Sequence, residues 1–359
     1  MNDNNTKIYI EAIDCYRGLA ALFVTTIHLN INTLFGNTLF KNGLFVQLFF
    51  VISGYVLYIN YHKKLENLSS FRQFLKKRFL RLYPLHLFFL LLFLILEVCK
   101  FIAVQYFGII PNRPVFVENN FSSFVYNLFL IQNFFGSPGS YNGPSWSISA
   151  EFFTYIIFAF TIIFFKKKLI YILILYIFIF IFYFSNFFNY DWGYHGWLSC
   201  MYSFSIGVIF AKIYLYKKLI LKTYLINSIF LITLILTIFF IGNKTLDYYM
   251  PFLFGYLLYI TSSLSKISLI YKIVFNKFLI FLGKISYSIY LSHVLIYWCM
   301  TQFMKIIIKW PLESNESMHV LKFTAIEGTI FFCIFIFLTI SFSIFTYSKI
   351  EKRFYKKLK

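Results

Sequence analysis

The sequence predicts an all-α polytopic membrane protein with about ten transmembrane helices and both termini in the cytoplasm. Three observations support this fold class. Of the 359 residues, 60% are hydrophobic and 24% are aromatic, far above the usage of an average globular domain. Apolar windows long enough to cross a bilayer recur along the chain, and basic residues concentrate in alternate connections between them. We expect residues 1–359 to form a single membrane domain.

Each predicted span is a run of roughly 17 to 25 mostly apolar residues, the length that a helix needs to cross the hydrocarbon core. The eighth window is short, so we expect it to tilt little or to be partly re-entrant. The windows lie near residues 14–35, 43–61, 82–105, 147–165, 169–187, 197–215, 223–241, 250–265, 280–304 and 323–347.

The distribution of Lys and Arg predicts the orientation. With the N-terminus inside, 25 of the 33 basic residues fall in cytoplasmic segments and six in outer segments. The positive-inside rule therefore favours cytoplasmic termini. The net charge of +20 is spread over five inner loops and a tail, so anionic lipid headgroups explain most of it and no nucleic-acid partner is expected.

One stretch is more basic than headgroup contact requires. Residues Lys63–Arg81 hold seven basic side chains in nineteen positions. Tyr83 and Pro84 follow directly and predict the start of the third helix, because the residue before a proline disfavours the helical region. The stretch binds either anionic lipid or a polyanionic ligand.

The first window carries two ionisable residues, Arg17 and His28, eleven positions apart. At about 100° per residue, both side chains share one stripe of a helix, roughly 16 Å apart along its axis. Ionisable groups inside a membrane are costly and usually functional. This pair favours a membrane enzyme.

Estimates of depth in the membrane place Glu151 at the level of His28 and two further polar residues nearby. With a rise of about 1.5 Å per residue, His28 and Glu151 both lie roughly 6 to 10 Å below the outer face, and Ser53 and His293 lie near the midplane. Ser286, Tyr290 and His293 share one stripe of the ninth helix. The cytoplasmic end gathers Arg17, Arg78 and Arg81.

Each of these residues also has a purely structural explanation. A single histidine or serine in a membrane often hydrogen-bonds a neighbouring helix. Arg17 alone is explained by an extended side chain that reaches the headgroups, and Glu151 by exposure to water near the interface. Several such residues at one level are harder to explain in this way.

Five motifs and a closing segment follow one another along nearly the whole chain. Asp14, Arg17, Gly18 and His28 in "IDCYRGLAALFVTTIH" resemble the arginine, ten-residue gap, histidine signature of acyltransferase family 3, the membrane O-acyltransferases of bacterial surface glycans. A closing segment, "YSKIEKRF", is similar to the family's last motif but has Lys352 where proline is common. The other matches are "FFVISGY" (49–55), "RFLRLYP" (78–84), "PSWSISAE" (144–151) and "ISYSIYLSH" (285–293).

The resemblance implies an acyl-CoA donor, usually acetyl-CoA, used from the cytoplasm, and a sugar hydroxyl as acceptor. It implies a multi-pass protein of the bacterial inner membrane that modifies surface polysaccharide such as the lipopolysaccharide O-antigen. About a dozen residues follow the tenth window, so the chain resembles the stand-alone form without a periplasmic hydrolase-like domain. No metal is expected, and the oligomeric state is left open, a homodimer included.

A division of roles follows as a hypothesis. The phosphates of coenzyme A stay at the inner face against Lys77, Arg78 and Arg81, because charge-assisted bonds suit phosphate. The uncharged pantetheine arm passes Arg17 and presents the thioester to His28. His28 acts as a general base or carries the acyl group transiently, and the sequence does not separate one-step from two-step transfer.

The remaining polar residues are assigned to support His28. Glu151 orients and charge-balances the imidazole, in the manner of a base-orienting carboxylate. The candidate donors to the developing oxyanion are Ser53, Ser147, Tyr290 and His293. The motifs add Asp14, Trp146, Ser286 and Tyr287 as supporting residues.

Two rival classes predict other features. A transporter or glycan flippase also needs polar groups near the midplane, but it predicts broken helices and internal repeats that the sequence does not clearly show. A catalytically idle scaffold leaves the matched depth of His28 and Glu151 unexplained. The acceptor stays open among lipopolysaccharide, capsule, peptidoglycan precursors and small glycosides. The connection 107–141 and the aromatic run 189–197 are candidates for sugar binding or for an interfacial aromatic belt.

Overall fold

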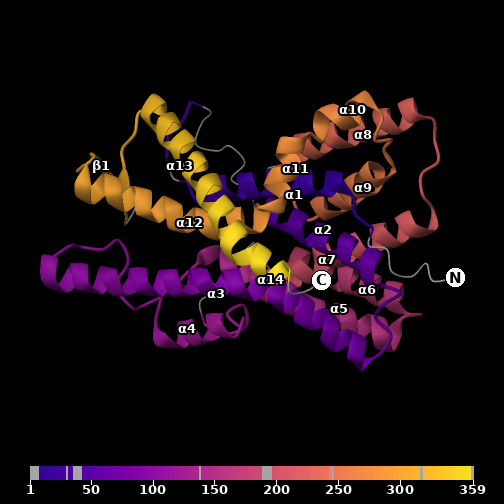
Figure 1. The fold of residues 1–359 in the computed structure, drawn as a ribbon, viewed down its shortest axis with the longest axis horizontal. Coiled ribbons are helices and arrows are strands. Elements are labelled where there is room, and N and C mark those ends of the chain that lie inside the picture. The colour runs from indigo at the N-terminus through magenta and orange to yellow at the C-terminus, as the bar shows by residue number, and fades with distance from the viewer. Residues whose placement is uncertain are drawn as a thin grey trace. The chain divides into compact units, whose positions relative to one another are not determined.

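The computed structural model describes residues 8–29, 31–34, 43–136, 139–187, 196–241, 243, 246–315 and 318–356. Helices make up most of it (Figure 1), and within these ranges two strands form a single antiparallel pair. The predicted all-α class is confirmed. Most of the aromatic run 189–197 lies outside the described residues.

The elements follow one another in the chain with short connections, apart from the longer ones between α1 and α2 and between α3 and α5. They are α1 (Glu11–Ile27), α2 (Leu44–Tyr61), α3 (Leu68–Phe107), α4 (Phe121–Leu128), η1 (Gly143–Ser145), α5 (Trp146–Phe165), α6 (Leu169–Phe187), α7 (Gly196–Tyr216), α8 (Thr223–Phe240), α9 (Met250–Ser263), α10 (Leu269–Val274), α11 (Lys277–Lys284), α12 (Ser286–Gln302), η2 (Phe303–Ile307), β1 (Leu312–Asn315), β2 (Met318–Leu321), α13 (Ala325–Thr346), η3 (Tyr347–Glu351) and α14 (Lys352–Lys356).

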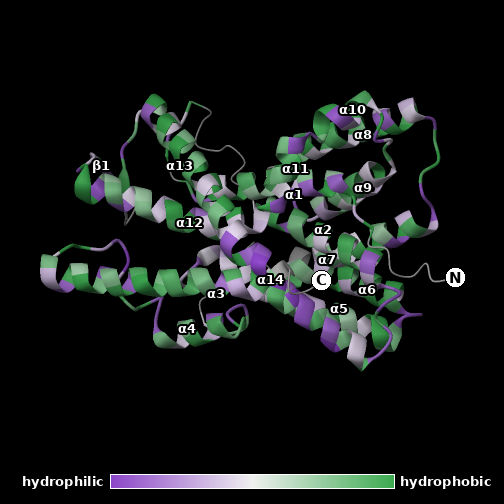
Figure 2. Cartoon of the chain, in the orientation of Figure 1, coloured by the Kyte–Doolittle hydropathy of each residue, from purple (hydrophilic) through white to green (hydrophobic). Residues whose placement is uncertain are grey.

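Among the described residues, six helical segments are long and apolar enough to cross a membrane: α2, α3, η1 with α5, α7, α8, and α13 with its continuation. A seventh is obtained if α11 and α12, which are bent by 70° at their break, form one span. Figure 2 shows the apolar residues along α3 and α13. A polytopic membrane protein is therefore supported, with fewer full-length spans than the ten predicted.

The difference in number has a local cause. Each predicted window contains a helix, but α1 has 17 residues and α9 has 14, and the side chains of α6 are described only as far as Tyr183. The first window extended to residue 35, whereas α1 ends at Ile27. A hydropathy window continues through apolar residues that follow a helix, so it overestimates helix length.

The long helix α3 corrects another prediction. It runs for 40 residues and contains Pro84 in its interior, so the predicted helix start at Tyr83 and Pro84 is wrong. A proline in a helix loses one backbone hydrogen bond, but its fixed φ is helical, and membrane helices tolerate it. The basic stretch is thus helical from Leu68 onward.

The chain divides into two compact units. Unit 1 comprises Met1–Ala21, Asn42–Arg78 and Ala150–Ser286. Its helices α2 and α7 approach closely, because a Cβ atom added at Gly207 would lie 2.1 Å from the carbonyl oxygen of Val51. Glycine is required at such a position because only its backbone allows two helices to come so close.

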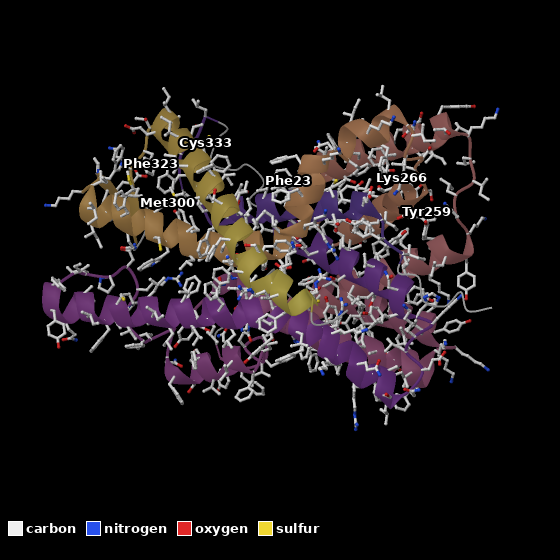
Figure 3. The ribbon with its side chains drawn as sticks, viewed as in Figure 1. Phe23, Tyr259, Lys266, Met300, Phe323 and Cys333 are labelled. Carbon is white, nitrogen blue, oxygen red and sulfur yellow. The ribbon has the colours of Figure 1, made fainter. Side chains whose placement is uncertain are left out.

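Unit 2 comprises Leu22–Lys41, Phe79–Ser149 and Tyr287–Lys359. Met300 of α12 packs against its apolar core (Figure 3). The helix α13 begins with a capping box in which Thr324 and Glu327 bond each other's backbone amides, which satisfies free N–H groups of its first turn. The buried members of this core are Leu29, Ile31, Leu321, Phe323, Phe331 and Phe335.

Candidate functional site

Two histidines of unit 2 lie against each other. The side chain of His28 is exposed, and that of His293, within α12, is fully buried. Their ring centroids are 5.2 Å apart, and the ring planes are inclined by 35°. Neither ring nitrogen of His293 has a hydrogen-bond partner among the described residues. Both histidines were predicted site residues, and the structure brings them together.

The position of His28 follows from the way α1 ends. The hydroxyl groups of Thr25 and Thr26 donate to the carbonyl oxygens of Leu22 and Phe23, three residues earlier, at 2.6 and 2.7 Å. The helix stops at Ile27, so His28 follows its last residue and does not lie inside a longer helix as predicted. Leu29 then enters the apolar core of unit 2, which fixes the chain directly after His28.

The start of α5 and the segment before it are bonded to α12 close to His293. Ser147 Oγ lies 2.8 Å from Tyr290 Oη, and both oxygens lie 3.0 Å from the carbonyl oxygen of Pro144. The amide group of Asn142 donates to the carbonyl of Leu291 at 3.1 Å. The predicted supporting residues Ser147 and Tyr290 therefore meet. Their hydroxyl groups bond each other and the same carbonyl oxygen of Pro144.

Two other motif residues of unit 2 have structural contacts. Tyr287 donates its hydroxyl hydrogen to the carbonyl of Leu82 at 2.7 Å, directly after Arg81 in α3. The carbonyl of Trp146 accepts a hydrogen bond from Asn133 at 2.8 Å. These bonds hold α12 to α3 and fix the start of α5, so Tyr287 and Trp146 position the site's helices.

In unit 1 the carboxylate of Glu151 accepts hydrogen bonds from Ser53 on α2 and from Tyr155 on α5. Glu151 is half-buried and Ser53 is buried. Two hydroxyl donors suit a carboxylate because hydrogen bonds to an ionised acceptor are strong. The predicted residues Ser53 and Glu151 therefore meet directly.

The start of α1 forms a second polar group in unit 1. Arg17 lies 3.4 Å from Asp14, which also accepts a hydrogen bond from Tyr9. Burial and this hydrogen bond raise the pKa of Tyr9, so its phenol stays protonated and able to donate. A Cβ atom added at Gly283 would lie 1.9 Å from the carbonyl oxygen of Asp14, so α1 and α11 cross in close contact. Ser286, three residues later, donates to the Gly283 carbonyl at 2.9 Å.

Arg78 is held between aromatic rings at the basic start of α3. Its guanidinium lies 5.4 Å from the ring centre of Tyr61 and 5.8 Å from that of Phe74, and it donates to the Tyr61 hydroxyl at 3.3 Å. Its Nε atom is buried without a hydrogen-bond partner in the described part of the chain. Lys77 is exposed and Arg81 is half-buried. A planar cation with an unused N–H group suits an anionic ligand.

The predicted approach of His28 to Glu151 stays a prediction, because His28 belongs to unit 2 and Glu151 to unit 1. The same holds for the predicted passage from Arg17 to His28 and for the depths assigned to these residues. Within each unit, the structure pairs His28 with His293, Ser147 with Tyr290, Ser53 with Glu151, and Asp14 with Arg17.

Glu97, which had no role in the predicted site, anchors the connection that follows α3. Its buried carboxylate accepts from Lys100 at 2.7 Å, from the amide of Phe116 at 2.8 Å and from Asn119 at 2.8 Å. Phe116 has a φ of 57°, an uncommon value for a bulky residue. The chain therefore folds back onto α3, which no local sequence signal indicated.

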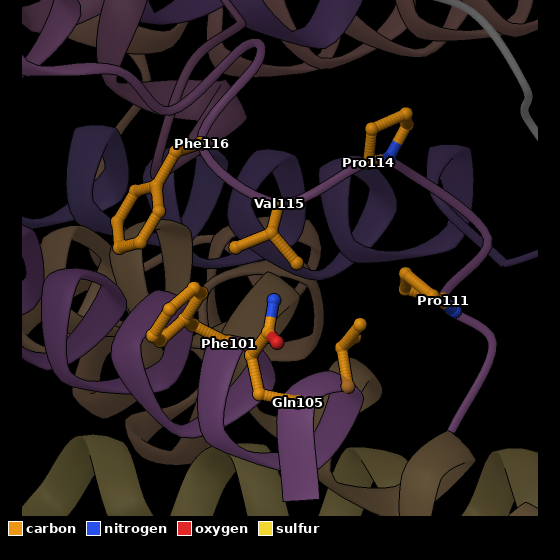
Figure 4. A pocket seen from close by; sticks show the side chains of 7 residues that line it. Phe101, Gln105, Pro111, Pro114, Val115 and Phe116 are labelled. Carbon is orange, nitrogen blue, oxygen red and sulfur yellow. The ribbon is translucent and has the colours of Figure 1, made fainter. Parts of the chain in front are cut away.

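This fold-back forms a pocket of about 490 Å³. In Figure 4, Phe101 and Gln105 of α3 lie across from Val115 and Phe116 of the connection. The lining is apolar except for the amide of Gln105, and it comprises Phe101, Val104, Gln105, Pro111, Pro114, Val115 and Phe116.

Glu351 is a second carboxylate that the sequence reasoning missed. It is buried in unit 2 and accepts a hydrogen bond from Ser288 of α12 at 3.0 Å. Its position inside "YSKIEKRF", the segment that is similar to the family's last motif, was the available signal. Among the described residues no group of three or more His, Cys, Asp or Glu side chains is placed to hold a metal ion.

Comparison with known proteins gives one family and two partial relatives. A family model described as "Acyltransferase domain" matches residues 10–348. The chain is 41% identical over 91 residues to "Protein 2 in picA locus" of Rhizobium radiobacter, and this match covers 25% of the chain and 47% of the relative. It is 34% identical over 116 residues to "Acyltransferase MdmB" of Streptomyces mycarofaciens, covering 32% of the chain and 26% of the relative.

The chain thus spans about half the length of the first relative and about a quarter of the second. No solved structure matches.

Proposed function

This chain belongs to acyltransferase family 3, and from that membership we propose that it transfers an acetyl group from cytoplasmic acetyl-CoA to a hydroxyl group of a surface or lipid-linked glycan outside the bacterial inner membrane. The observation that carries the proposal is the exposed imidazole of His28 at the end of α1, eleven residues after Arg17. A base that removes a hydroxyl proton has to be reachable by its substrate.

The chemistry at His28 is a proton transfer coupled to acyl transfer. A neutral imidazole nitrogen takes the proton of the acceptor hydroxyl while its oxygen attacks the thioester carbon. The carbon–sulfur bond then breaks, and the thiolate of coenzyme A leaves with the proton that His28 held. General base catalysis of this kind contributes about 10²- to 10⁴-fold.

The hydroxyl groups of Ser147 and Tyr290 are the proposed donors to the oxyanion of this reaction. Both lie within 3.0 Å of the Pro144 carbonyl oxygen, so a hydroxyl hydrogen has to turn from this carbonyl towards the substrate. Such a turn requires rotation about a single bond only.

The donor proposal rests on Arg78. Its buried Nε atom lacks a partner in the described residues, while its guanidinium plane is fixed between Tyr61 and Phe74. This arrangement supports binding of a phosphate group of coenzyme A, with Lys77 and Arg81 adding positive charge. In the proposal, Arg17 contacts the pantetheine arm.

A transfer assay tests the function. Membrane vesicles that contain the full chain are incubated with radiolabelled acetyl-CoA, the glycan fraction is extracted, and its O-acetyl groups are identified by NMR. We expect label in the glycan, and we expect His28→Ala and Arg17→Ala to abolish it while membrane insertion is retained. Arg113→Ala is the matched control, since Arg113 is exposed and paired with Glu118.

Two results would contradict the proposal. Near-normal transfer by both His28→Ala and Arg17→Ala would show that the site is wrong. Movement of a glycan across the vesicle membrane without release of coenzyme A would instead support a transporter or flippase.

The two-step alternative places the acetyl group on an imidazole nitrogen of His28 before the acceptor attacks. Rapid quenching of the protein with labelled acetyl-CoA and no acceptor tests this route. Label on the protein that is absent from His28→Ala would support the acyl-histidine, and no label would favour direct transfer.

A further inference from the structure

His293 is a buried histidine whose hydrogen-bonding capacity is unused. Its side chain is 0% exposed, and both Nδ1 and Nε2 lack a hydrogen-bond partner among the described residues. Buried polar atoms almost always have partners, because an unpaired one keeps the full cost of its desolvation. A ring in this state points to a partner that forms or tightens its contact during function.

The ring of His28 is placed to be that partner. Two imidazoles joined by one N–H···N hydrogen bond have their centres roughly 5 Å apart, and the centres of His28 and His293 are 5.2 Å apart. His28 is exposed and follows the last residue of α1, so its ring is not held between helical turns on both sides.

His293, by contrast, is held in place. Asn142 donates to the carbonyl of Leu291, two residues before it, and Tyr290, three residues before it, is bonded to Ser147 and Pro144. The ring of Tyr290 lies 6.1 Å from that of His293, but its hydroxyl is already engaged with these two residues. The fixed imidazole can therefore set the orientation of the exposed one.

We propose that His293 is the positioning residue of the transfer site: it accepts a hydrogen bond from the N–H of His28 and so directs the other nitrogen of His28 towards the acceptor hydroxyl. This inference rests on the proposed function. His293 takes the orienting role that the sequence analysis gave to Glu151, and it does so as a neutral acceptor.

The proton balance is simple. The acceptor hydroxyl gives its proton to the free nitrogen of His28, and the resulting imidazolium keeps its other N–H bonded to His293. When the carbon–sulfur bond breaks, the thiolate takes the transferred proton and His28 returns to the neutral form. His293 stays neutral and uncharged throughout the reaction.

Three substitutions separate this role from a packing role. His293→Leu removes the acceptor and keeps an apolar side chain of moderate size. His293→Gln and His293→Asn keep an amide oxygen as acceptor. The Gln oxygen lies about as far from the backbone as Nε2 of the histidine, and the Asn oxygen about as far as Nδ1. Ser292→Ala is the matched control, because Ser292 is equally buried on α12 but bonds Ser343 of α13.

The readout is the initial rate of acetyl transfer from radiolabelled acetyl-CoA into the glycan of membrane vesicles containing the full chain. We expect His293→Leu to lower the rate at saturating acetyl-CoA by about 100-fold, with KM for acetyl-CoA changed by less than about twofold. The amide variant whose oxygen reaches His28 should have a transfer rate about tenfold higher than that of His293→Leu. Ser292→Ala should keep the wild-type rate.

The inference is overturned if His293→Leu keeps a rate within twofold of wild type while His28→Ala is inactive, or if both amide variants are no better than His293→Leu. If His293→Leu does not give monodisperse protein on size exclusion, equal transfer rates of the Gln and Asn variants overturn the inference, because only one of the two side-chain lengths can place the acceptor oxygen within hydrogen-bond distance of His28. An active His28→Ala, or an inactive wild type, refutes the proposed function itself.

Discussion

Ser53 of α2 donates a hydrogen bond to the carboxylate of Glu151 on α5, so two residues 98 positions apart meet within unit 1. Tyr155, one helical turn after Glu151, donates a second hydrogen bond to the same carboxylate. A half-buried carboxylate among apolar helices needs such donors because its desolvation is costly. This group ties α2 to α5 through polar contacts in an otherwise apolar environment.

Removing one donor should destabilise unit 1. We expect Ser53→Ala or Tyr155→Phe to lower the free energy of unfolding by about 1.5–3 kcal/mol each, the usual worth of a hydrogen bond to a charged group. Thermal unfolding of the purified protein in detergent, followed by size exclusion, measures the loss. Tyr171→Phe on α6 is the control, since Tyr171 is 75% exposed. Equal transitions for all three variants would contradict the prediction.

The close approach of α2 and α7 should not tolerate a methyl group. A Cβ atom at Gly207 would lie 2.1 Å from the Val51 carbonyl oxygen, so Gly207→Ala has to push the two helices apart. We expect a loss of about 1–3 kcal/mol, as for other overpacked interiors. Gly143→Ala is the control, because nothing lies within 4 Å of the added atom there. The same unfolding measurement applies, and a smaller loss at Gly207 than at Gly143 would show that the contact is not tight.

The shape of the cation at position 78 should matter as well as its charge. Arg78→Lys keeps the positive charge but loses the Nε donor and the planar group between Tyr61 and Phe74. We expect KM for acetyl-CoA to rise about tenfold, with little change in kcat, because the lost contact acts on binding. Arg113→Lys is the control. An unchanged KM, measured from the acetyl-transfer rate at varied acetyl-CoA, would remove Arg78 from the donor site.

The carboxylate of Glu97 should control the order of the connection after α3. In Glu97→Ala the amide of Phe116 loses its acceptor, and the positive φ of Phe116 loses the contact that supports it. We expect hydrogen exchange at this amide to accelerate about 10- to 100-fold. Exchange followed by mass spectrometry of peptides covering 108–119 measures it. Arg113→Ala, which breaks the exposed pair with Glu118, should leave the Phe116 amide protected; slow exchange in both variants would mean that the anchor lies elsewhere.

Much of the fold could be predicted, because a membrane requires continuous apolar segments and these are visible as windows of hydropathy. The short eighth window did indicate the short α9. The break before Ser286 could not be found in this way, since a window averages over a bend. The continuation of α3 through Pro84 was missed because the rule for proline describes a preference that packing can override.

For the site, helical spacing and depth selected residues that do meet, such as Ser147 with Tyr290 and Ser53 with Glu151. Depth along a helix does not give the direction in which a side chain points, so the contact of His28 with His293 was not foreseen. The role of Glu97 depends on a chain reversal whose residues carry no periodic pattern.

The length of α3 has a consequence for how a charged substrate arrives. Its 40 residues extend for about 60 Å, twice the thickness of a hydrocarbon core of about 30 Å. A helix of this length has more residues than one crossing needs, and its first turns carry the exposed Arg72, Lys76 and Lys77. These exposed positive charges lie within six residues of one another, and such a basic cluster attracts polyanions from a distance. If the proposed function holds, capture of a coenzyme A thioester should accordingly become slower as ionic strength rises and shortens the range of that attraction.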